Sequence, residues 1–361
     1  MEQLFNGKAF YVKECANIMY TKMKLQDSRE YIIKKEKEVI PSMSFDPARD
    51  FVEQREALEK KLFELLNMPD NHTSHAPIIE YRDASDPRYE DIRFVVETEP
   101  GFYVPAHLLL PKEPKGKLPL VICLQGHTEG MHISMAREAY PGKKPISVEG
   151  DRDFCIQALK CGYAALAIEQ RGFGELAPAF KLGWENSCHH LSWSAVMMGK
   201  TLLGDRLHDI SAVIDAVEIG FADYIDTKKI GIMGNSGGGT SSYYAMCVDK
   251  RISVAMPSSC FCTLVDSWGS LPHCGCAYVP NILKYMEMAD LAMLIAPRPL
   301  VLVIGHSDPI NPLDKTQEAF EVVKQIYAAA GASDNCHLVI GDGGHRFYAK
   351  DAWPVFEKCL I

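Results

Sequence analysis

The sequence predicts an α/β fold, with a mostly parallel β-sheet covered by helices on both faces. Two observations lead to this prediction. From about residue 91 onward, short continuous apolar runs alternate with helical stretches, as expected for strands that are buried on both faces of a sheet. Glycine and polar residues follow several of these runs, at the carboxyl ends of strands where such sheets bind ligands. The 361 residues allow one large domain with additions or two modest domains.

The expected elements follow from apolar runs and from turn and capping residues. Strands are expected at 92–98, 103–110, 118–124, 163–168, 252–256, 300–304 and 337–340, with another in the apolar run that leads to Gly234. Helices are expected at about 151–160, 207–217 and 312–330, and directly after the turn at 234–238. An earlier helix should begin at Asp46-Pro47, where a carboxylate caps and proline takes the first helical position, and should end at about Asn67.

Composition and charge exclude several classes of protein. The apolar share of 47% and the charged share of 24% are those of an ordinary globular protein. A net charge of −9 disfavours a nucleic-acid or anionic-membrane partner, and no apolar run is long enough to span a bilayer. The N-terminus lacks the pattern of a signal peptide, and the twelve cysteines are scattered. These features predict a cytoplasmic protein with reduced cysteines.

The central motif is Gly234-Asn235-Ser236-Gly237-Gly238. It follows an apolar run and precedes an uncharged stretch, so a strand, a tight turn and a helix are expected in that order. Glycines at 234 and 238 allow the strand and the helix to approach each other because neither carries a Cβ atom. A serine at the apex of such a turn has an exposed hydroxyl. Ser236 is therefore the candidate nucleophile.

An acid and a histidine follow the candidate nucleophile at the ends of two later strands. Asp308 follows the strand at 300–304, and His345 follows the strand at 337–340. His345 would take the serine proton and return one to the leaving group, while Asp308 would orient the imidazole. Asp342 lies too near His345 on the same loop, and Asp314 falls inside the next helix. The order serine, acid, histidine differs from the orders of chymotrypsin and subtilisin.

An oxyanion hole needs two hydrogen-bond donors. The N–H of Gly237, at the start of the helix, is the first candidate. The second is expected from the loop Gln125-Gly126-His127 after the strand at 118–124, with the N–H of His127 as the choice. The imidazole of His127 either lines the pocket or is merely exposed.

These residues give the chain a resemblance to the α/β-hydrolase superfamily, in the branch of dienelactone-hydrolase-like and acetyl-xylan-esterase-like bacterial proteins. The resemblance covers residues 85–361 and includes the motifs at 100–106, 170–175, 273–280 and 295–299. It implies an α/β-hydrolase fold and hydrolysis of carboxylic esters, often of acetylated carbohydrates, with no cofactor. Two features differ from relatives: Gln125 stands where many have histidine, and dienelactone hydrolases proper use cysteine where Ser236 stands.

The expected division is a helical N-terminal extension at residues 1–84 and a catalytic domain at residues 85–361. The extension packs on the domain, forms an interface in a homo-oligomer or overhangs the active site. Cap insertions are expected at about 175–203 and 260–290, over the site. The candidates for substrate binding are Gln125, Trp184, Trp193 and Trp268. The tryptophan rings either stack on sugar rings or fill the cap.

A cysteine-rich stretch holds Cys260, Cys262, Cys274 and Cys276, with His273 beside them. A metal site is one interpretation, although paired zinc-binding cysteines usually stand two to four residues apart. Reduced cysteines packed in the cap are the simpler interpretation, so no metal is expected.

The resulting hypothesis is a serine esterase that acts on short-acyl esters of small molecules or carbohydrates. Two alternatives remain. A serine peptidase of the prolyl-oligopeptidase type has the same triad order, but it usually carries a large N-terminal propeller, which about 85 mostly helical residues cannot form. A non-catalytic hydrolase-like binding protein typically lacks a triad member, and none is missing here.

Overall fold

The computed structural model describes residues 27–69, 75–114, 116–127, 130–139, 144–178 and 187–360. The chain divides into two compact units, at residues 1–39 and 40–361. The described part of the first unit contains helix α2 (Ser28–Lys37), whose first N–H groups are capped by the side chain of Asp27. No residue of α2 is buried. All other described elements belong to the second unit.

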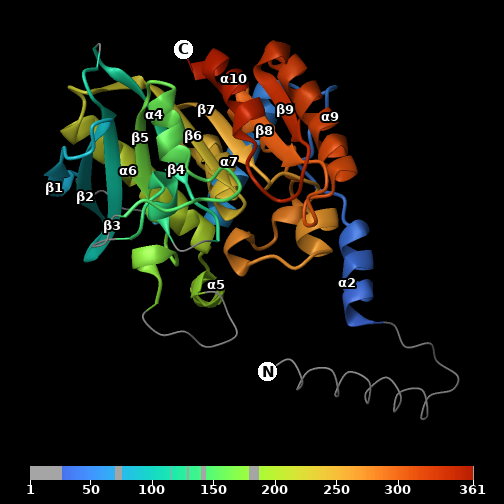
Figure 1. Cartoon of the computed structure of the whole chain (residues 1–361). Coiled ribbons are helices and arrows are strands. Elements are labelled where there is room, and N and C mark those ends of the chain that lie inside the picture. The colour runs from blue at the N-terminus through green and yellow to red at the C-terminus, as the bar shows by residue number, and fades with distance from the viewer. Residues whose placement is uncertain are drawn as a thin grey trace, which may run out of the picture. The chain divides into compact units, whose positions relative to one another are not determined.

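The second unit is built on a nine-stranded sheet with the order β1-β2-β3-β5-β4-β6-β7-β8-β9 among the described residues (Figure 1). The strands β1, β2, β3 and β5 pair antiparallel, and the pairs from β5 through β4 to β9 are parallel. The strands are β1 (Ile78–Asp83), β2 (Tyr89–Glu99), β3 (Phe102–Pro111), β4 (Leu118–Leu124), β5 (Ala164–Ile168), β6 (Ile225–Asn235), β7 (Ile252–Ser258), β8 (Leu300–Gly305) and β9 (Cys336–Gly341). The predicted mostly parallel α/β fold is confirmed.

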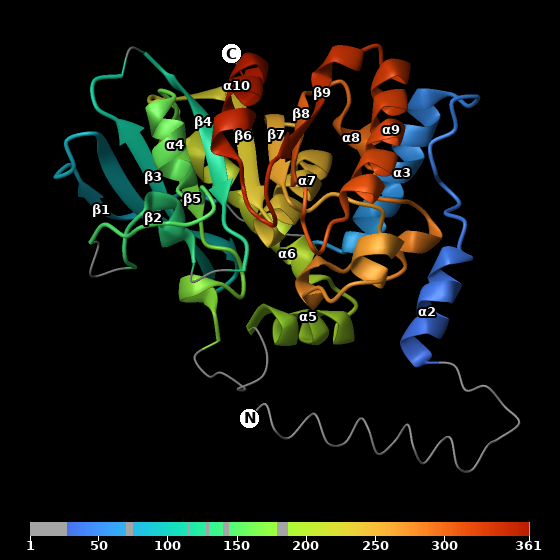
Figure 2. The same ribbon diagram turned by 45° about the vertical axis from the view of Figure 1, so that its right-hand side comes forward.

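Helices cover both faces of this sheet (Figure 2). They are α3 (Phe51–Leu66), α4 (Phe154–Lys160), α6 (Leu202–Gly220), α7 (Gly237–Val248), α8 (Ala292–Ile295), α9 (Leu313–Ala329) and α10 (Ala349–Leu360). Helix α5 (Ser187–Met197) belongs to neither large core and packs against α6 beyond the end of the sheet. Short 3-10 turns lie at η2 (Met131–Met135), η3 (Gly174–Leu176), η5 (Gly275–Ala277), η6 (Ile282–Lys284) and η7 (Ser333–Asn335), and a π turn lies at η4 (Val265–Gly269). None of the described helices has the length and apolar character that a membrane span requires.

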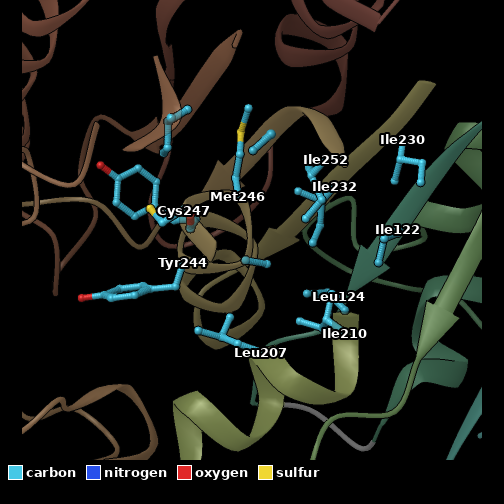
Figure 3. Close-up of a cluster of buried hydrophobic side chains, with 14 of the residues drawn as sticks. Ile122, Leu124, Leu207, Ile210, Ile230, Ile232, Tyr244, Met246, Cys247 and Ile252 are labelled. Atoms are coloured by element: carbon cyan, nitrogen blue, oxygen red, sulfur yellow. Dashed lines mark hydrogen bonds between the residues drawn. The ribbon is translucent and has the colours of Figure 1, made fainter. Parts of the chain in front are cut away.

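Alternating side chains of the central strands enter two hydrophobic cores. In β4, Leu120, Ile122 and Leu124 join the core formed with α3, α6, α7, α8 and α9. Val121 and Cys123, which point to the other face, join the core formed with α4 and α10. Figure 3 shows part of the first core, where side chains of β4 and β6 meet those of α6 and α7. Burial on both faces explains why these strands are continuous apolar runs.

The predicted boundary between an extension and a catalytic domain is wrong. Helix α3 buries Leu58, Leu62 and Leu66 in the first core, where it contacts α8. Residues 78–83, expected in a helical extension, form strand β1, which pairs with β2 at the edge of the sheet. This strand is mostly exposed, so its sequence lacks the apolar pattern of the other strands. The second unit therefore begins at about residue 40.

Candidate active site

Ser236 lies at a sharp turn between β6 and α7. Its backbone has φ 57° and ψ −123°, a conformation that is unusual for a residue with a side chain. A Cβ atom on Gly238 would lie 2.2 Å from the carbonyl oxygen of Leu124, and one on Gly234 would lie 2.4 Å from the carbonyl oxygen of Gly238. The turn therefore requires glycine at both positions, as the sequence predicted.

Asp308 and His345 form a hydrogen-bonded pair at the carboxyl ends of β8 and β9. These strands are parallel neighbours, and backbone hydrogen bonds from His306 to Gly341 and from Ser307 to Gly343 continue beyond them. Asp308 Oδ2 lies 2.8 Å from Nδ1 of His345. Asp308 Oδ1 accepts the N–H groups of Ile310 and Asn311, at 3.0 and 3.1 Å. The carboxylate is thus held from two sides.

The hydrogen bonds at Asp308 favour its ionised form. Burial of this carboxyl raises its pKa, but the hydrogen bond from His345 and those from the two backbone N–H groups outweigh burial, so the pKa of Asp308 lies below its usual value. A negative charge at this position stabilises the imidazole tautomer with its proton on Nδ1. Nε2 is then free to accept a proton.

The end of β7 connects Ser236 to the histidine loop. The N–H of Ser236 donates to the carbonyl of Ser258 at 2.8 Å. The hydroxyl groups of Ser258 and Ser259 both lie within hydrogen-bond distance of the carbonyl of Arg346, at 3.3 and 3.2 Å. This places the residue next to His345 against the strand beside the serine turn. Ser236 and His345 accordingly line one cavity.

Two cavities meet at Ser236. The larger, of about 810 Å³, has His345, Glu149, Asp151, Arg152 and Arg346 among its lining residues and is therefore rich in charge. The smaller, of about 170 Å³, is lined mainly by apolar and neutral side chains, including Trp268, Pro272, Ala277 and Ile310. Ser236 thus lies between a larger cavity with charged walls and a smaller cavity that contains no Asp, Glu, Lys or Arg among its described lining residues.

The loop after β4 lies against the serine turn. A Cβ atom on Gly126 would lie 2.6 Å from the carbonyl oxygen of Asn235 and 3.0 Å from Cβ of Ser236, so only glycine fits there. The ring of His127 lies beside Gly237, with Nδ1 3.3 Å from the position of a Cβ atom on that glycine. Gly237 is the first residue of α7, and its N–H has no acceptor within the helix. Both predicted oxyanion residues are therefore next to Ser236.

The three tryptophans that were candidates for substrate binding differ in their position relative to the cavities. Trp268 is buried, lines the smaller cavity and stacks on His273 with ring centroids 4.9 Å apart. Trp193 is 56% exposed, its ring meets that of His189 edge-to-face with centroids 5.8 Å apart, and it is absent from the described lining of both cavities. Trp184 lies outside the described residues.

The expectation for Gln125 is wrong. Its side chain is buried and donates to Ser134 Oγ at 2.6 Å and to the carbonyl of Arg152 at 2.7 Å. It is not among the described residues that line the two cavities at Ser236. The amide therefore ties the loop after β4 to Ser134 and to the backbone of Arg152, and so positions that loop.

Two further residues of the site were not predicted. His273 lines the smaller cavity and lies 3.0 Å from Ser267 Oγ through Nε2. Burial lowers its pKa, which favours the neutral imidazole. Asn311 lines the same cavity and donates to the carbonyl of Ser259. In the sequence, His273 is marked only by the cysteines beside it, and Asn311 only by its position three residues after Asp308.

The described residues include one group whose side chains could hold a metal ion. It consists of His127, Cys188, Cys274 and Cys276, whose ligand atoms all lie within 4.8 Å of one another.

A family model described as an Abhydrolase family matches residues 26–342, which is most of the chain. The chain belongs to this family. The predicted resemblance to α/β-hydrolases is confirmed, and the sheet order and the serine turn described above agree with it.

Individual relatives of this α/β-hydrolase are distant. "Putative hydrolase YtaP" of Bacillus subtilis (strain 168) is 24% identical over 293 residues, which cover 79% of this chain and 92% of that protein. A solved structure described as a "putative acetyl xylan esterase" from Bacteroides fragilis NCTC 9343 has a TM-score of 0.73 at 17% identity and covers 92% of this chain and 84% of its own. A glucuronoyl esterase from Solibacter usitatus has a TM-score of 0.62 at 14% identity, with 90% and 98% covered. At these identities the structural similarity establishes the fold.

Proposed function

We propose that this α/β-hydrolase is a serine carboxylic-ester hydrolase that works through an acyl-enzyme. The observation that supports the proposal is the hydrogen-bonded pair of Asp308 and His345 at strand ends beside the turn that carries Ser236, with His345 and Ser236 lining one cavity. A hydroxyl is a weak nucleophile at neutral pH. It needs a base beside it and donors for the oxyanion that its attack creates.

In the first half of the proposed reaction, Ser236 Oγ attacks the carbonyl carbon of the ester while its proton passes to Nε2 of His345. The carbonyl oxygen becomes an oxyanion and accepts hydrogen bonds from the N–H groups of Gly237 and His127. When the tetrahedral intermediate collapses, the bond to the alcohol oxygen breaks and His345 protonates that oxygen. The acyl group remains on Ser236.

In the second half, a water molecule attacks the acyl carbon and His345 takes one of its protons. The bond to Ser236 Oγ breaks, His345 returns the proton to Oγ, and the carboxylic acid leaves. Asp308 stays ionised throughout and stabilises the imidazolium that forms in each half. No step requires a cofactor.

The two cavities suggest how an ester would be oriented. The smaller cavity, with Trp268, Pro272 and Ala277 in its wall, suits a short acyl chain such as acetyl. The larger and more polar cavity suits a polar alcohol such as a sugar. Short-acyl esters of carbohydrates are therefore the proposed substrates, in keeping with the acetyl xylan esterase and glucuronoyl esterase that share the fold.

The test compares hydrolysis of p-nitrophenyl acetate, p-nitrophenyl butyrate, an acetylated xylo-oligosaccharide and a peptide anilide. Ser236→Ala should fold but lose nearly all ester hydrolysis, because only the residual catalysis of binding and oxyanion donors, about 10³ to 10⁴ over water, can remain. Ser253→Ala is the control, because the Ser253 hydroxyl donates to the carbonyl of Ile230 and is not among the described lining of either cavity. Undiminished hydrolysis by Ser236→Ala would refute the mechanism, and faster cleavage of the anilide would favour a peptidase.

A further inference from the structure

Three separate segments bring three thiols and an imidazole to one point beside the proposed active site. His127 comes from the loop after β4, Cys188 from the first turn of α5, and Cys274 and Cys276 from the segment around η5. Sγ of Cys188 lies 3.2 Å from Sγ of Cys274, and Sγ of Cys276 lies 3.4 Å from Nε2 of His127. All four candidate ligand atoms lie within 4.8 Å of one another.

These distances fit a tetrahedral metal ion at the centre of the group. With Zn–S bonds of about 2.3 Å and a Zn–N bond of about 2.0 Å, a regular tetrahedron has S···S edges of about 3.8 Å and S···N edges of about 3.5 Å. The two shortest contacts, at 3.2 and 3.4 Å, are a few tenths of an ångström below these edges, and no pair is more than 4.8 Å apart, so small shifts of the side chains would complete a tetrahedron. A disulfide is a poorer description, because its sulfur atoms would be about 2.0 Å apart and only two of the four side chains would be used.

We propose that His127, Cys188, Cys274 and Cys276 form a structural Zn²⁺ site that joins α5 and the segment around η5 to the loop after β4. Three thiolates and one imidazole are a common donor set of structural zinc sites. Soft thiolate ligands exclude magnesium and calcium, which prefer oxygen. Because protein atoms occupy all four positions, no position is left for a catalytic water.

The surroundings of the group also suit a bound ion. Cys188 and Cys276 are buried in a small apolar cluster with Phe173 and Leu202, and the rings of Phe173 and His127 make an edge-to-face contact with centroids 5.2 Å apart. This shell shields the site from water on the side of Cys188 and Cys276, whereas Cys274 is half-buried and His127 is exposed. Zinc with three thiolates carries one net negative charge. The buried guanidinium of Arg206 lies 4.4 Å from the centre of the Phe173 ring, which belongs to the same cluster, and offsets that charge.

Hydrogen bonds hold the ligand-bearing segments independently of a metal. The N–H of Gly275, between the two cysteines, donates to Nδ1 of His189 at 3.1 Å. Ser192 Oγ donates to the carbonyl of Cys188 at 2.6 Å. The first contact joins the segment around η5 to α5, and the second lies within α5, so Cys188 and Cys274 are brought close together before an ion binds.

This inference reverses the expectation of no metal. The cysteine-rich stretch suggested a site built from Cys260, Cys262, Cys274 and Cys276. The structure instead joins only Cys274 and Cys276, and it adds two ligands that are distant in sequence. If the proposed function is also correct, the ion fixes the ring of the residue whose N–H would be an oxyanion donor.

The first experiment measures the metal content of the untagged full-length chain, produced with zinc in the medium, by plasma mass spectrometry. About one zinc per chain is expected, and Cys188→Ser/Cys274→Ser should hold at least about tenfold less, because the removed thiolates are first-choice zinc ligands. Cys260→Ser is the matched control, since Cys260 is a buried cysteine outside the group and should leave the zinc content unchanged. Equal loss of zinc in the control would contradict the assignment.

The second experiment needs only the wild-type chain, so it decides the question if the double variant fails to fold. Zinc is removed with a chelator and replaced by Co²⁺, which should give thiolate-to-cobalt charge-transfer bands and the intense visible bands of a tetrahedral ion. Less than about 0.1 zinc per chain together with absence of these bands would overturn the proposal, as would a mass lower by two hydrogens that reveals a disulfide.

Metal content is read without turnover, so the two proposals can fail separately. Ser236→Ala should keep its zinc although it loses ester hydrolysis. A chain that holds zinc but hydrolyses no ester would refute the proposed function alone.

Discussion

At the scale of single residues, hydrogen bonds to both oxygens of Asp308 fix its carboxylate against the imidazole of His345. Each of its two oxygens has its own partners: His345 on one side, and the N–H groups of Ile310 and Asn311 on the other. The hydrogen bond to Nδ1 leaves Nε2 of His345 as the proton acceptor. An uncharged amide at this position can keep the backbone contacts but not the favoured tautomer.

Asp308→Asn should therefore separate orientation from folding. The Asn oxygen can still accept from Ile310 and Asn311, so the thermal midpoint should change little. Its NH₂ group would donate to the imidazole and favour the wrong tautomer, which should lower kcat by a factor of about 10⁴. Steady-state kinetics on p-nitrophenyl acetate measure the loss. Asp314→Asn makes the same change at an exposed position of α9 and should have no effect; a similar loss there, or full activity in Asp308→Asn, would contradict the assigned role.

Trp268 tests which cavity receives the acyl group. It is buried, stacks on His273 and lines the smaller cavity. Trp268→Ala should enlarge that cavity and raise the ratio of kcat/KM for butyrate over acetate by about tenfold, since extra methylene groups in an apolar pocket contribute about 1–3 kcal/mol. Trp193→Ala, at an exposed tryptophan, should leave the ratio unchanged. An unaltered ratio in Trp268→Ala would place the acyl group elsewhere.

A site residue could be predicted from the sequence where the residues directly before it mark its position, and not where its partners are distant along the chain. Ser236, Asp308 and His345 follow strands that the apolar runs reveal, so the order of parallel strand ends was enough to select them. Gln125 was misjudged because its burial depends on Ser134 and on the carbonyl of Arg152, which no local pattern links to it. Cys188 was not selected because its partners come from two other segments of the chain.

At the scale of elements, the buried carboxyl of Glu169 joins two loops above the sheet. It follows β5 directly and accepts the N–H of Met131, at the start of η2, and the N–H of Glu175 in η3. Burial raises the pKa of Glu169 and outweighs the opposite effect of the two N–H groups, so that its pKa is about 7. The loops after β4 and β5 are thus held by a group that ionises near neutral pH.

Glu169→Gln should change how stability depends on pH. The folded chain holds the Glu169 proton up to about pH 7, whereas a free glutamate has lost it near the usual 4.5. Folding therefore favours the protonated form, and the free energy of unfolding of the wild type should fall by about 3 kcal/mol as pH rises from below 4.5 to above 7. The Gln variant lacks this contribution.

Urea unfolding at pH 4 and pH 8 measures the change. The wild type should lose about 3 kcal/mol more than Glu169→Gln between these values. Glu56→Gln on the exposed side of α3 is the control and should follow the wild type. Parallel pH profiles of the wild type and Glu169→Gln would show that this carboxyl does not ionise with a raised pKa.

Strands could be predicted where their burial requires a continuous run of apolar residues. The strands β4, β5, β7 and β8 are buried on both faces, so their apolar runs gave nearly the observed bounds. Strand β1 was missed because an exposed edge strand needs no apolar alternation. The membership of α3 in the second unit was not visible, since its apolar stripe of Leu58, Leu62 and Leu66 shows that it packs but not on what.

At the scale of the whole molecule, the second unit contains the sheet, both large cores and the cavities at Ser236. Its first long helix, α3, is part of the larger of these cores. The only helix described in the first unit, α2, buries no residue. This distribution of buried surface predicts that the unit from residue 40 onward folds and works alone.

Deletion of residues 1–39 should therefore cost less than 1 kcal/mol and lower the unfolding midpoint by less than about 2 °C. The truncated chain should have a kcat/KM for p-nitrophenyl acetate within about twofold of that of the full chain, because less than about 0.5 kcal/mol of transition-state stabilisation would be lost. Leu62→Ala provides the contrast: it removes a fully buried side chain of α3 and should cost about 3 kcal/mol through lost burial and a cavity. If the deletion destabilises the chain as much as Leu62→Ala, the first 39 residues supply packing to the second unit, and the division of the chain at residue 40 does not describe its stability.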